Sequence, residues 1–240
     1  MTENLRHLVR YTLRDDTISN VDNSASVFIQ DEEGGRLTSA VGQTISYDRR
    51  DTRFLPSSGY YLKIDEDVAG LGGDNQYLRH EGRFDYYFPF TPNVVLDLGA
   101  GAGYIFGYGG EKVHIANRFF IGGATLRGFQ YGGVGPRDKD THDALGGNSY
   151  YVGTAELRFP LGLPNELRIF GRSFVDAGTL TGIDVHGPSL QDSGKIRVGA
   201  GVGVSWLSPL GPLAIDLAEP IIKDSGDKTE LFRFSFGTRF

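Results

Sequence analysis

The chain has 240 residues and a formal net charge of −6, because 30 Asp and Glu outnumber 24 Lys and Arg. This acidic balance excludes a nucleic-acid-binding surface, and the absence of cysteine excludes disulfides, thiolate zinc sites and cysteine nucleophiles. Its 35 glycines, 16 Phe and 12 Tyr favour sheet over helix, since Gly costs about 1 kcal/mol at a helical position. No apolar run is long enough for a transmembrane helix, and the N-terminal MTENLRHLVRYTL lacks a signal-peptide pattern.

Alternation of apolar with polar or small residues predicts ten strands. The pattern is clearest in 94–106 and 196–206, where the even positions are apolar and most odd positions are glycine or polar. A period of two is the signature of a strand, and these runs have the length of a tilted membrane strand. In chain order the predicted strands are 4–14, 38–49, 59–68, 76–88, 93–107, 149–159, 166–178, 195–206, 212–219 and 230–240.

The predicted connections alternate between short and long. Short turns fall at 50–58, 89–92, 160–165 and 207–211, and longer polar links fall at 15–37, 69–75, 108–148, 179–194 and 220–229. Outer-membrane barrels have short turns at one end and long loops at the other. The sequence therefore predicts an all-β fold, an antiparallel transmembrane β-barrel that forms one domain over 1–240. Residues 22–33 are expected to add one or two helical turns.

The two faces of the predicted strands differ in a way that fits a membrane barrel. One face of the strands is polar or bare. It carries the charges Arg79, Glu81, Arg83 and Asp85, which could line a wet lumen, and elsewhere only glycine, as in 199–203. The apolar faces end in aromatic residues, which suits a lipid-interface girdle; these are Tyr60, Tyr104, Phe106, Tyr151, Phe159, Trp206 and Phe240. A soluble barrel with its apolar face inside remains the alternative at this point.

Motifs for catalysis or cofactor binding are weak. The spacing Gly99-x-Gly101-x-Gly103 resembles part of a nucleotide loop, but no helix follows it. The acidic run Asp138–Asp143 lacks the glycine and distal glutamate of a calcium loop, so a solvated loop is favoured. The histidines lack metal-ligand spacing, and no nucleophile-elbow motif occurs. We therefore expect no catalytic residue, no metal and no cofactor, and a protein that is not an enzyme.

The C-terminal segment FRFSFGTRF ends on an aromatic residue. Phe232, Phe234, Phe236 and Phe240 share one face. A chain that stops on a lipid-facing phenylalanine has the pattern that bacterial outer-membrane barrels present for insertion. Phe234, Phe236, Gly237 and Phe240 are the candidate C-terminal strand signal.

Four blocks resemble the barrel of BamA-type outer-membrane assembly factors, the bacterial surface antigen or POTRA-barrel insertase superfamily. They are RFFIGGATLRGFQYGGVGP, GGNSYYVGTAELRFPL, FVDAGTL and the segment from IRVGAGVGVSWLSPLGPL to the C-terminus. The resemblance covers essentially the whole chain. It implies that these are the last ten strands of a barrel of about sixteen, whose sixth extracellular loop carries an Arg-Gly-Phe or Arg-Gly-Tyr motif.

The resemblance also implies a site. The loop 108–148 would fold into the lumen, with Arg127, Gly128 and Phe129 at its tip and Glu156 and Asp176 as its wall partners. The strand pattern agrees, because Glu156 alternates with Leu157 and Asp176 with Val175, so both carboxylates point to the polar face. A guanidinium offers a rigid fork of donors that two carboxylates can hold, whereas lysine would act as a point charge.

By the same resemblance the function would be the folding and insertion of outer-membrane proteins in the bacterial outer membrane. The partners would be outer-membrane lipid, unfolded outer-membrane protein clients and periplasmic or lipoprotein assembly partners. Family members carry a signal peptide, POTRA domains and further strands before the point at which this sequence begins. This chain is thus expected to be a fragment or a reduced ten-strand barrel, inactive alone. The alternatives are a passive outer-membrane pore or two-partner secretion-type transporter, and a soluble lipid-binding barrel.

Overall fold

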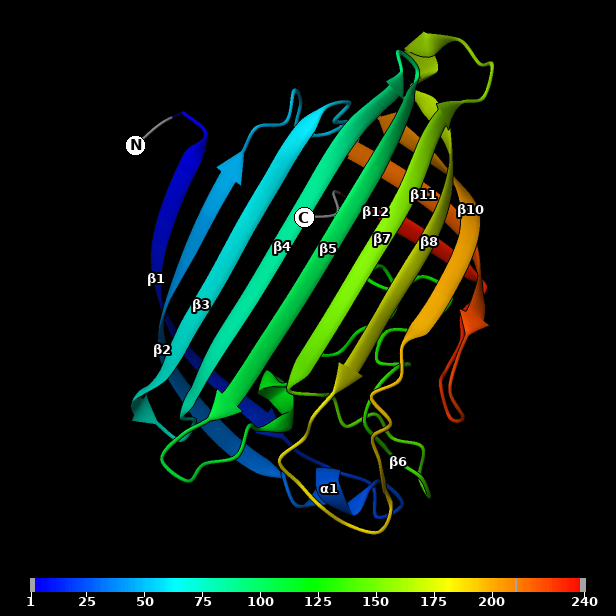
Figure 1. Cartoon of the computed structure of the whole chain (residues 1–240). Helices are drawn as coiled ribbons and strands as arrows, with labels where there is room; N and C mark the ends of the chain where they lie inside the picture. The colour runs from blue at the N-terminus through cyan, green and yellow to red at the C-terminus, as the bar shows by residue number, and fades with distance from the viewer. Residues whose placement is uncertain (1–2, 210, 238–240) are drawn as a thin grey trace.

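A computed structural model describes residues 3–209 and 211–237 and shows one large antiparallel sheet (Figure 1). Its ten strands follow one another in chain order, apart from two short strands outside the sheet. They are β1 (Leu5–Ile18), β2 (Gly34–Asp48), β3 (Gly59–Gly73), β4 (Tyr77–Thr91), β5 (Val94–Gly107), β7 (Ser149–Pro160), β8 (Ile169–Thr181), β10 (Arg197–Ser208), β11 (Gly211–Ile222) and β12 (Phe232–Phe236). Among the described residues β1 and β12 each pair with one neighbour, so the sheet is curved but not closed.

The remaining elements are small and, apart from η2 in the short connection between β7 and β8, lie at the end of the sheet that carries the long loops. The strands β6 (Arg137–Asp138) and β9 (Leu190–Gln191) pair with each other. The helix α1 (Val27–Gln30) begins after Ser26, whose Oγ accepts a hydrogen bond from the backbone N–H of Phe28 at 3.3 Å. This is the helical turn expected in 22–33. Two short 3-10 helices are η1 (Ile115–Asn117) and η2 (Asn165–Leu167). No helix among the described residues is long and apolar enough to cross a membrane.

The predicted all-β antiparallel class is confirmed and each of the ten predicted strands is found, but most strand ends differ from the prediction by one to five residues. The expected link 69–75 is mostly strand, because β3 continues to Gly73 and leaves a three-residue turn. Its glycines suggested a loop, but Gly70 and Gly73 have φ of +126° and +84°, which lets the strand continue through a register irregularity opposite 38–40. The last strand is described as Phe232–Phe236, and residues 238–240 of the predicted strand lie outside the described residues.

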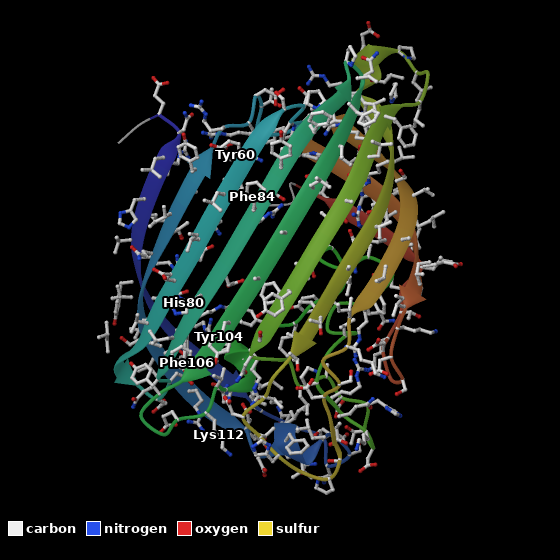
Figure 2. The ribbon with its side chains drawn as sticks, viewed as in Figure 1. Tyr60, His80, Phe84, Tyr104, Phe106 and Lys112 are labelled. Carbon is white, nitrogen blue, oxygen red and sulfur yellow. The ribbon has the colours of Figure 1, made fainter. Side chains whose placement is uncertain are left out.

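The convex face of the sheet is apolar and bears aromatic residues towards both ends. In Figure 2, Tyr60 and Phe84 lie near the end with the short turns, and Tyr104 and Phe106 lie towards the end with the long loops. The ring centroids are 6.3 Å apart in the first pair and 5.6 Å apart in the second. These two groups of aromatic residues match the girdles of a membrane barrel.

The concave face carries ion pairs instead. On β4, the Arg79 guanidinium lies 2.8 Å from Glu81, and Arg83 Nε lies 2.7 Å from Asp85. The four residues thus line one face as the sequence pattern predicts, and they are neutralised in pairs along the strand.

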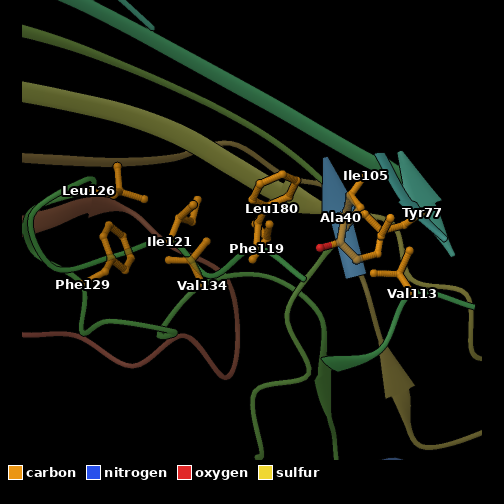
Figure 3. Packing of buried hydrophobic residues seen from close by; sticks show 11 residues of the cluster. Ala40, Tyr77, Ile105, Val113, Phe119, Ile121, Leu126, Phe129, Val134 and Leu180 are labelled. Atoms are coloured by element: carbon orange, nitrogen blue, oxygen red, sulfur yellow. The ribbon is translucent and has the colours of Figure 1, made fainter. Parts of the chain in front are cut away.

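The buried apolar cluster joins the segment 108–148 to the concave face of the sheet (Figure 3). Six of its members come from that segment, and the others come from strands. The cluster consists of Ala40, Ala69, Tyr77, Ile105, Val113, Phe119, Ile121, Leu126, Phe129, Val134 and Leu180. The hydrophobic core of this chain is thus formed by a long connection packed against the sheet that it connects.

Candidate functional site

Arg127 lies on the concave face with only 1% of its surface exposed. Its Nε donates to Asp176 Oδ2 at 2.6 Å and its Nη2 donates to Asp176 Oδ1 at 2.7 Å. The backbone N–H of Arg127 also donates to Asp176 Oδ2, at 3.0 Å. One carboxylate therefore holds both the side chain and the backbone of the loop, which fixes the position of the tip in two ways.

Glu156 and Thr154 complete the set of acceptors. Arg127 Nη1 donates to Glu156 Oε2 at 2.5 Å, and Nη2 also donates to Thr154 Oγ1 at 3.1 Å. Thr154 Oγ1 in turn donates to Asp176 Oδ1 at 2.5 Å. All three guanidinium nitrogens thus have partners, which a buried charge requires. The structure brings together the five predicted residues 127–129, 156 and 176 in one region.

Strand register explains why these partners meet. Thr154, Asp176 and Gly199 are direct neighbours across β7, β8 and β10. Gly199 faces the loop, and a Cβ built there would clash with the backbone carbonyl of Arg127. Gly199 therefore lets the loop backbone lie directly on the strand, whereas Gly201 and Gly203 leave room for Phe174 and for the pair Arg172 and Asp216. Phe174 lies below the guanidinium, with Arg127 Cζ 3.3 Å from its ring centroid.

The other two residues of the motif turn and pack the loop. Gly128 has a φ of +93°, in the left-handed region that favours glycine. Phe129 is fully buried in the apolar cluster. Next to them, the backbone of 128–133 runs beside 228–230: Glu230 N–H donates to Gly128 O at 3.0 Å and Gln130 N–H donates to Lys228 O at 2.9 Å. This contact with the last long loop has no signal in the sequence.

A second arginine, which the sequence analysis missed, extends the charge cluster. Arg172 Nη2 donates to both carboxylate oxygens of Asp216 at 2.5 Å, and Arg172 Nη1 lies 3.6 Å from Glu156 Oε1. Asp216 is buried. The sequence does contain a signal for this pair, because the alternation of polar and apolar residues places Arg172 and Asp216 on the polar face of predicted strands. Two arginines and three carboxylates therefore form one buried network across β7, β8 and β11 and the loop tip.

The electrostatics of the site keep Arg127 charged. Burial alone would lower the pKa of the guanidinium, but hydrogen bonds from it to Asp176 and the charges of Asp176 and Glu156 together raise that pKa. The site therefore holds a fixed cation between two anions. The side chain and the backbone of Arg127 are both bonded to the barrel wall, so the geometry points to a structural anchor.

The C-terminal residues lie apart from this network. Phe234 and Phe236 are exposed on the convex face of β12, opposite Ile215 and Leu213. Gly237 follows the strand, and its N–H donates to Pro212 O at 2.9 Å. Phe240 lies outside the described residues.

The acidic run 138–143 is solvated only in part, because Lys139, Asp140 and His142 are exposed as its composition favours, but its two ends are bonded to another segment. Asp138 is buried and accepts a hydrogen bond from Ser26 Oγ at 2.7 Å, and Asp143 accepts one from the Ser26 N–H at 2.8 Å. These contacts join the run to the start of α1. Within residues 3–209 and 211–237, no group of three or more His, Cys, Asp or Glu could hold a metal ion.

The fold and the site define a class: an outer-membrane β-barrel protein with an apolar convex face and a long connection anchored by an arginine on the concave face. A family model described as "Omp85 superfamily domain" matches residues 1–240, and the chain belongs to this superfamily.

Curated relatives agree with this assignment. The chain is 37% identical over 241 residues to "Outer membrane protein assembly factor BamA" of Neorickettsia risticii, which covers all of this chain and 32% of that protein. It is 30% identical over 231 residues to "Sorting and assembly machinery component 50 homolog" of Xenopus tropicalis, which covers 90% of this chain and 49% of that protein. The chain thus spans between a third and a half of these relatives.

A solved structure has the same fold. The crystal structure of BamA from Haemophilus ducreyi lacking POTRA domains 1–3 superposes with a TM-score of 0.84, over 97% of this chain and 51% of that one, at 23% identity.

Proposed function

We propose that the protein carrying this chain folds and inserts β-barrel proteins into the bacterial outer membrane. The support is family membership together with the names of the relatives, which describe assembly factors in both bacteria and eukaryotes. A passive pore or a secretion-type transporter is not favoured, because none of these names describes one. Folding and insertion of clients would depend on the shape of the protein and on binding, without a catalytic residue, metal or cofactor.

The observation that carries the proposal for the site is the anchoring of Arg127 by Asp176 and Glu156. The segment 108–148 acts as an extracellular loop folded into the lumen, and Arg127 is its anchor. Because the anchored loop also runs beside 228–230, it holds the hairpin of β11 and β12 in place. That hairpin ends at the free edge of the sheet, where a client strand would pair.

The partners proposed for the whole protein are outer-membrane lipid, unfolded outer-membrane protein clients and periplasmic or lipoprotein assembly partners. Phe234, Phe236, Gly237 and Phe240 serve as the signal for insertion of the protein's own last strand. The exposure of Phe234 and Phe236 on the convex face supports this role.

The test is reconstitution of the intact protein in liposomes together with an unfolded client barrel. We expect the client to become protease-resistant and heat-modifiable at a higher rate than in empty liposomes, and Arg127→Ala to lower that rate. Lysine at this position keeps the charge but loses the fork, so Arg127→Lys should restore little. Ion conductance without client folding would show a pore and contradict the proposal.

A further inference from the structure

The convex face of β1 to β4 carries a chain of hydrogen-bonded polar side chains, which we call the polar row: His7, Gln43, Glu66 and His80. Gln43, Glu66 and His80 are direct neighbours across β2, β3 and β4. Gln43 Nε2 donates to Glu66 Oε2 at 2.6 Å, and His80 Nδ1 lies 3.1 Å from Glu66 Oε1. His7 Nε2 lies 3.0 Å from Gln43 Oε1. Four strands thus contribute one continuous polar chain.

This row lies on the lipid-facing side. Ile45, Ile64 and Val68, two residues away on the same strands, are between 38% and 43% exposed and share the face. In Figure 2, His80 lies between the aromatic residues Tyr60 and Phe84 on one side and Tyr104 and Phe106 on the other. His80 is the direct neighbour of Tyr104 on β5. Since the aromatic groups mark the two interfaces, the polar row begins beside the aromatic group at the long-loop end and continues from there across β3, β2 and β1 on the lipid-facing side.

An ionisable group facing lipid is costly. The carboxylate of Glu66 is 39% exposed and the ring of His80 is 48% exposed, so neither is hidden by neighbouring strands. The internal hydrogen bonds lower the cost but leave His7 Nδ1 and His80 Nε2 without a recorded partner in the part of the chain that the structure describes. A row of this kind favours a partner that covers it and supplies polar groups.

The surface beside the row is smooth enough for close contact. Four small residues share the convex face across β4, β5 and β7: Gly82, Ala100, Ala102 and Gly153. A Cβ built on Gly82 would meet no atom within 4 Å. Small residues allow a neighbouring membrane segment to approach the backbone closely. The row and this strip together form a surface with both polar contacts and space.

We infer that the polar row is a lateral interface at which a second copy of this protein docks within the outer membrane. The row is complementary to itself, because an acceptor, the Glu66 carboxylate, lies between donor side chains. Two copies inserted in the same direction are related by a two-fold axis along the membrane normal. That axis reverses the order of the row and brings Glu66 of one copy opposite Gln43 or a histidine of the other.

Other occupants suit the row less well. A lipid head group at the interface could reach His80, which lies beside Tyr104, but the row continues from there over three further strands. An unrelated membrane protein would need its own matching polar groups, which nothing in this chain specifies. The inference depends on the outer-membrane location of the protein and not on its insertion activity.

Single-cysteine crosslinking in native membranes tests the interface, because the chain has no cysteine of its own. Ile64→Cys places a thiol beside Glu66 on the convex face, and Val202→Cys places a thiol at a more exposed position on the convex face of β10. With a short bifunctional thiol reagent on the intact protein, we expect a product of twice the mass for the first variant. The second should give about tenfold less of it.

Removal of the row in the Ile64→Cys background gives the decisive comparison. Glu66→Leu should lower the crosslinked fraction about tenfold, the effect of one lost interfacial hydrogen bond in a membrane, and His80→Leu should act in the same direction. Glu219→Leu removes an exposed carboxylate from the convex face of β11 and should leave crosslinking unchanged. Heat-modifiable gel mobility identifies folded variants.

Three results would overturn the inference. They are equal crosslinking at positions 64 and 202, crosslinking that is unchanged in folded Glu66→Leu and His80→Leu, and a crosslinked product whose mass shows a different partner.

Discussion

At the residue scale, the site depends on the geometry of one guanidinium. Arg127 uses Nε, Nη1 and Nη2 on two carboxylates and a hydroxyl, and its backbone N–H on one of the same carboxylates. A buried ion pair of this kind adds little net stability compared with apolar residues, but removal of one partner leaves an uncompensated buried charge. The network therefore specifies where the loop tip lies more than it strengthens the fold.

We expect Arg127→Ala to lower the free energy of unfolding by about 3 to 5 kcal/mol, because Asp176 and Glu156 would lose their buried counter-charge. Urea unfolding in detergent measures the change. In a double-mutant cycle, Arg127→Ala and Glu156→Ala should couple by about 1 to 3 kcal/mol. A coupling energy near zero would show that the 2.5 Å contact contributes nothing.

The close contact between Gly199 and the loop tip leads to a second prediction. Gly199→Ala should destabilise the protein by about 1 to 3 kcal/mol, because the new methyl group would clash with the carbonyl of Arg127. Gly82→Ala is the matched control, since it lies in a strand of the same sheet with open space at its Cβ. Equal unfolding midpoints for the two variants would contradict the close approach of the loop.

At the scale of elements, the last hairpin is held both by strand pairing and by contacts from outside the sheet. The strand β12 has only five residues, and the loop before it is fixed by two buried arginines. Arg137 donates to Gly226 O and to Gly133 O, and Arg197 Nε donates to Asp227 at 3.0 Å. Arg137 belongs to the segment 108–148 and also donates to Gly226 in the last loop, so these two connections form one unit.

The last loop should lose stability in acid. Hydrogen bonds, first from Ser193 and then from Lys195, lower the pKa of Asp224 to about 2. Because this lies below the ordinary value of about 3.9, the ionised carboxylate stabilises the fold above about pH 4, and that contribution is lost as the pH falls towards 2. The difference in unfolding free energy between wild type and Asp224→Asn should therefore shrink between about pH 6 and pH 2. A difference independent of pH would contradict this.

At the scale of the whole molecule, the sheet has two edges and two faces. The edges need a pairing partner, and the two faces suit different environments. The edges of β1 and β12 have a neighbour on one side only among the described residues. Unpaired N–H and C=O groups are costly in lipid. The convex face suits lipid, except at the polar row, and the concave face is covered by 108–148. The edges are therefore the part of the isolated chain that most needs a partner.

We expect residues 1–240, prepared alone in detergent, to self-associate through these edges, since each could supply the missing strand of another copy. Light scattering with correction for detergent measures the protein mass. Glu66→Leu should not change this mass, because edge pairing does not involve the polar row. A monodisperse monomer with a closed ten-strand barrel would contradict the expectation.

The amino-acid sequence alone determined the strand number, the two faces and the family. Strand alternation is a local property, so 94–106 and 196–206 indicate strands without knowledge of their neighbours, and the motif around Arg127 pointed to Glu156 and Asp176. Only the tertiary structure showed Arg172 with Asp216, the contact of 128–133 with 228–230, and the hydrogen bonds from Ser26 to the acidic run. It also revealed the polar row, because His7, Gln43, Glu66 and His80 lie on four different strands. Contacts between distant segments depend on register and on the path of a loop, and neither is encoded in a local pattern.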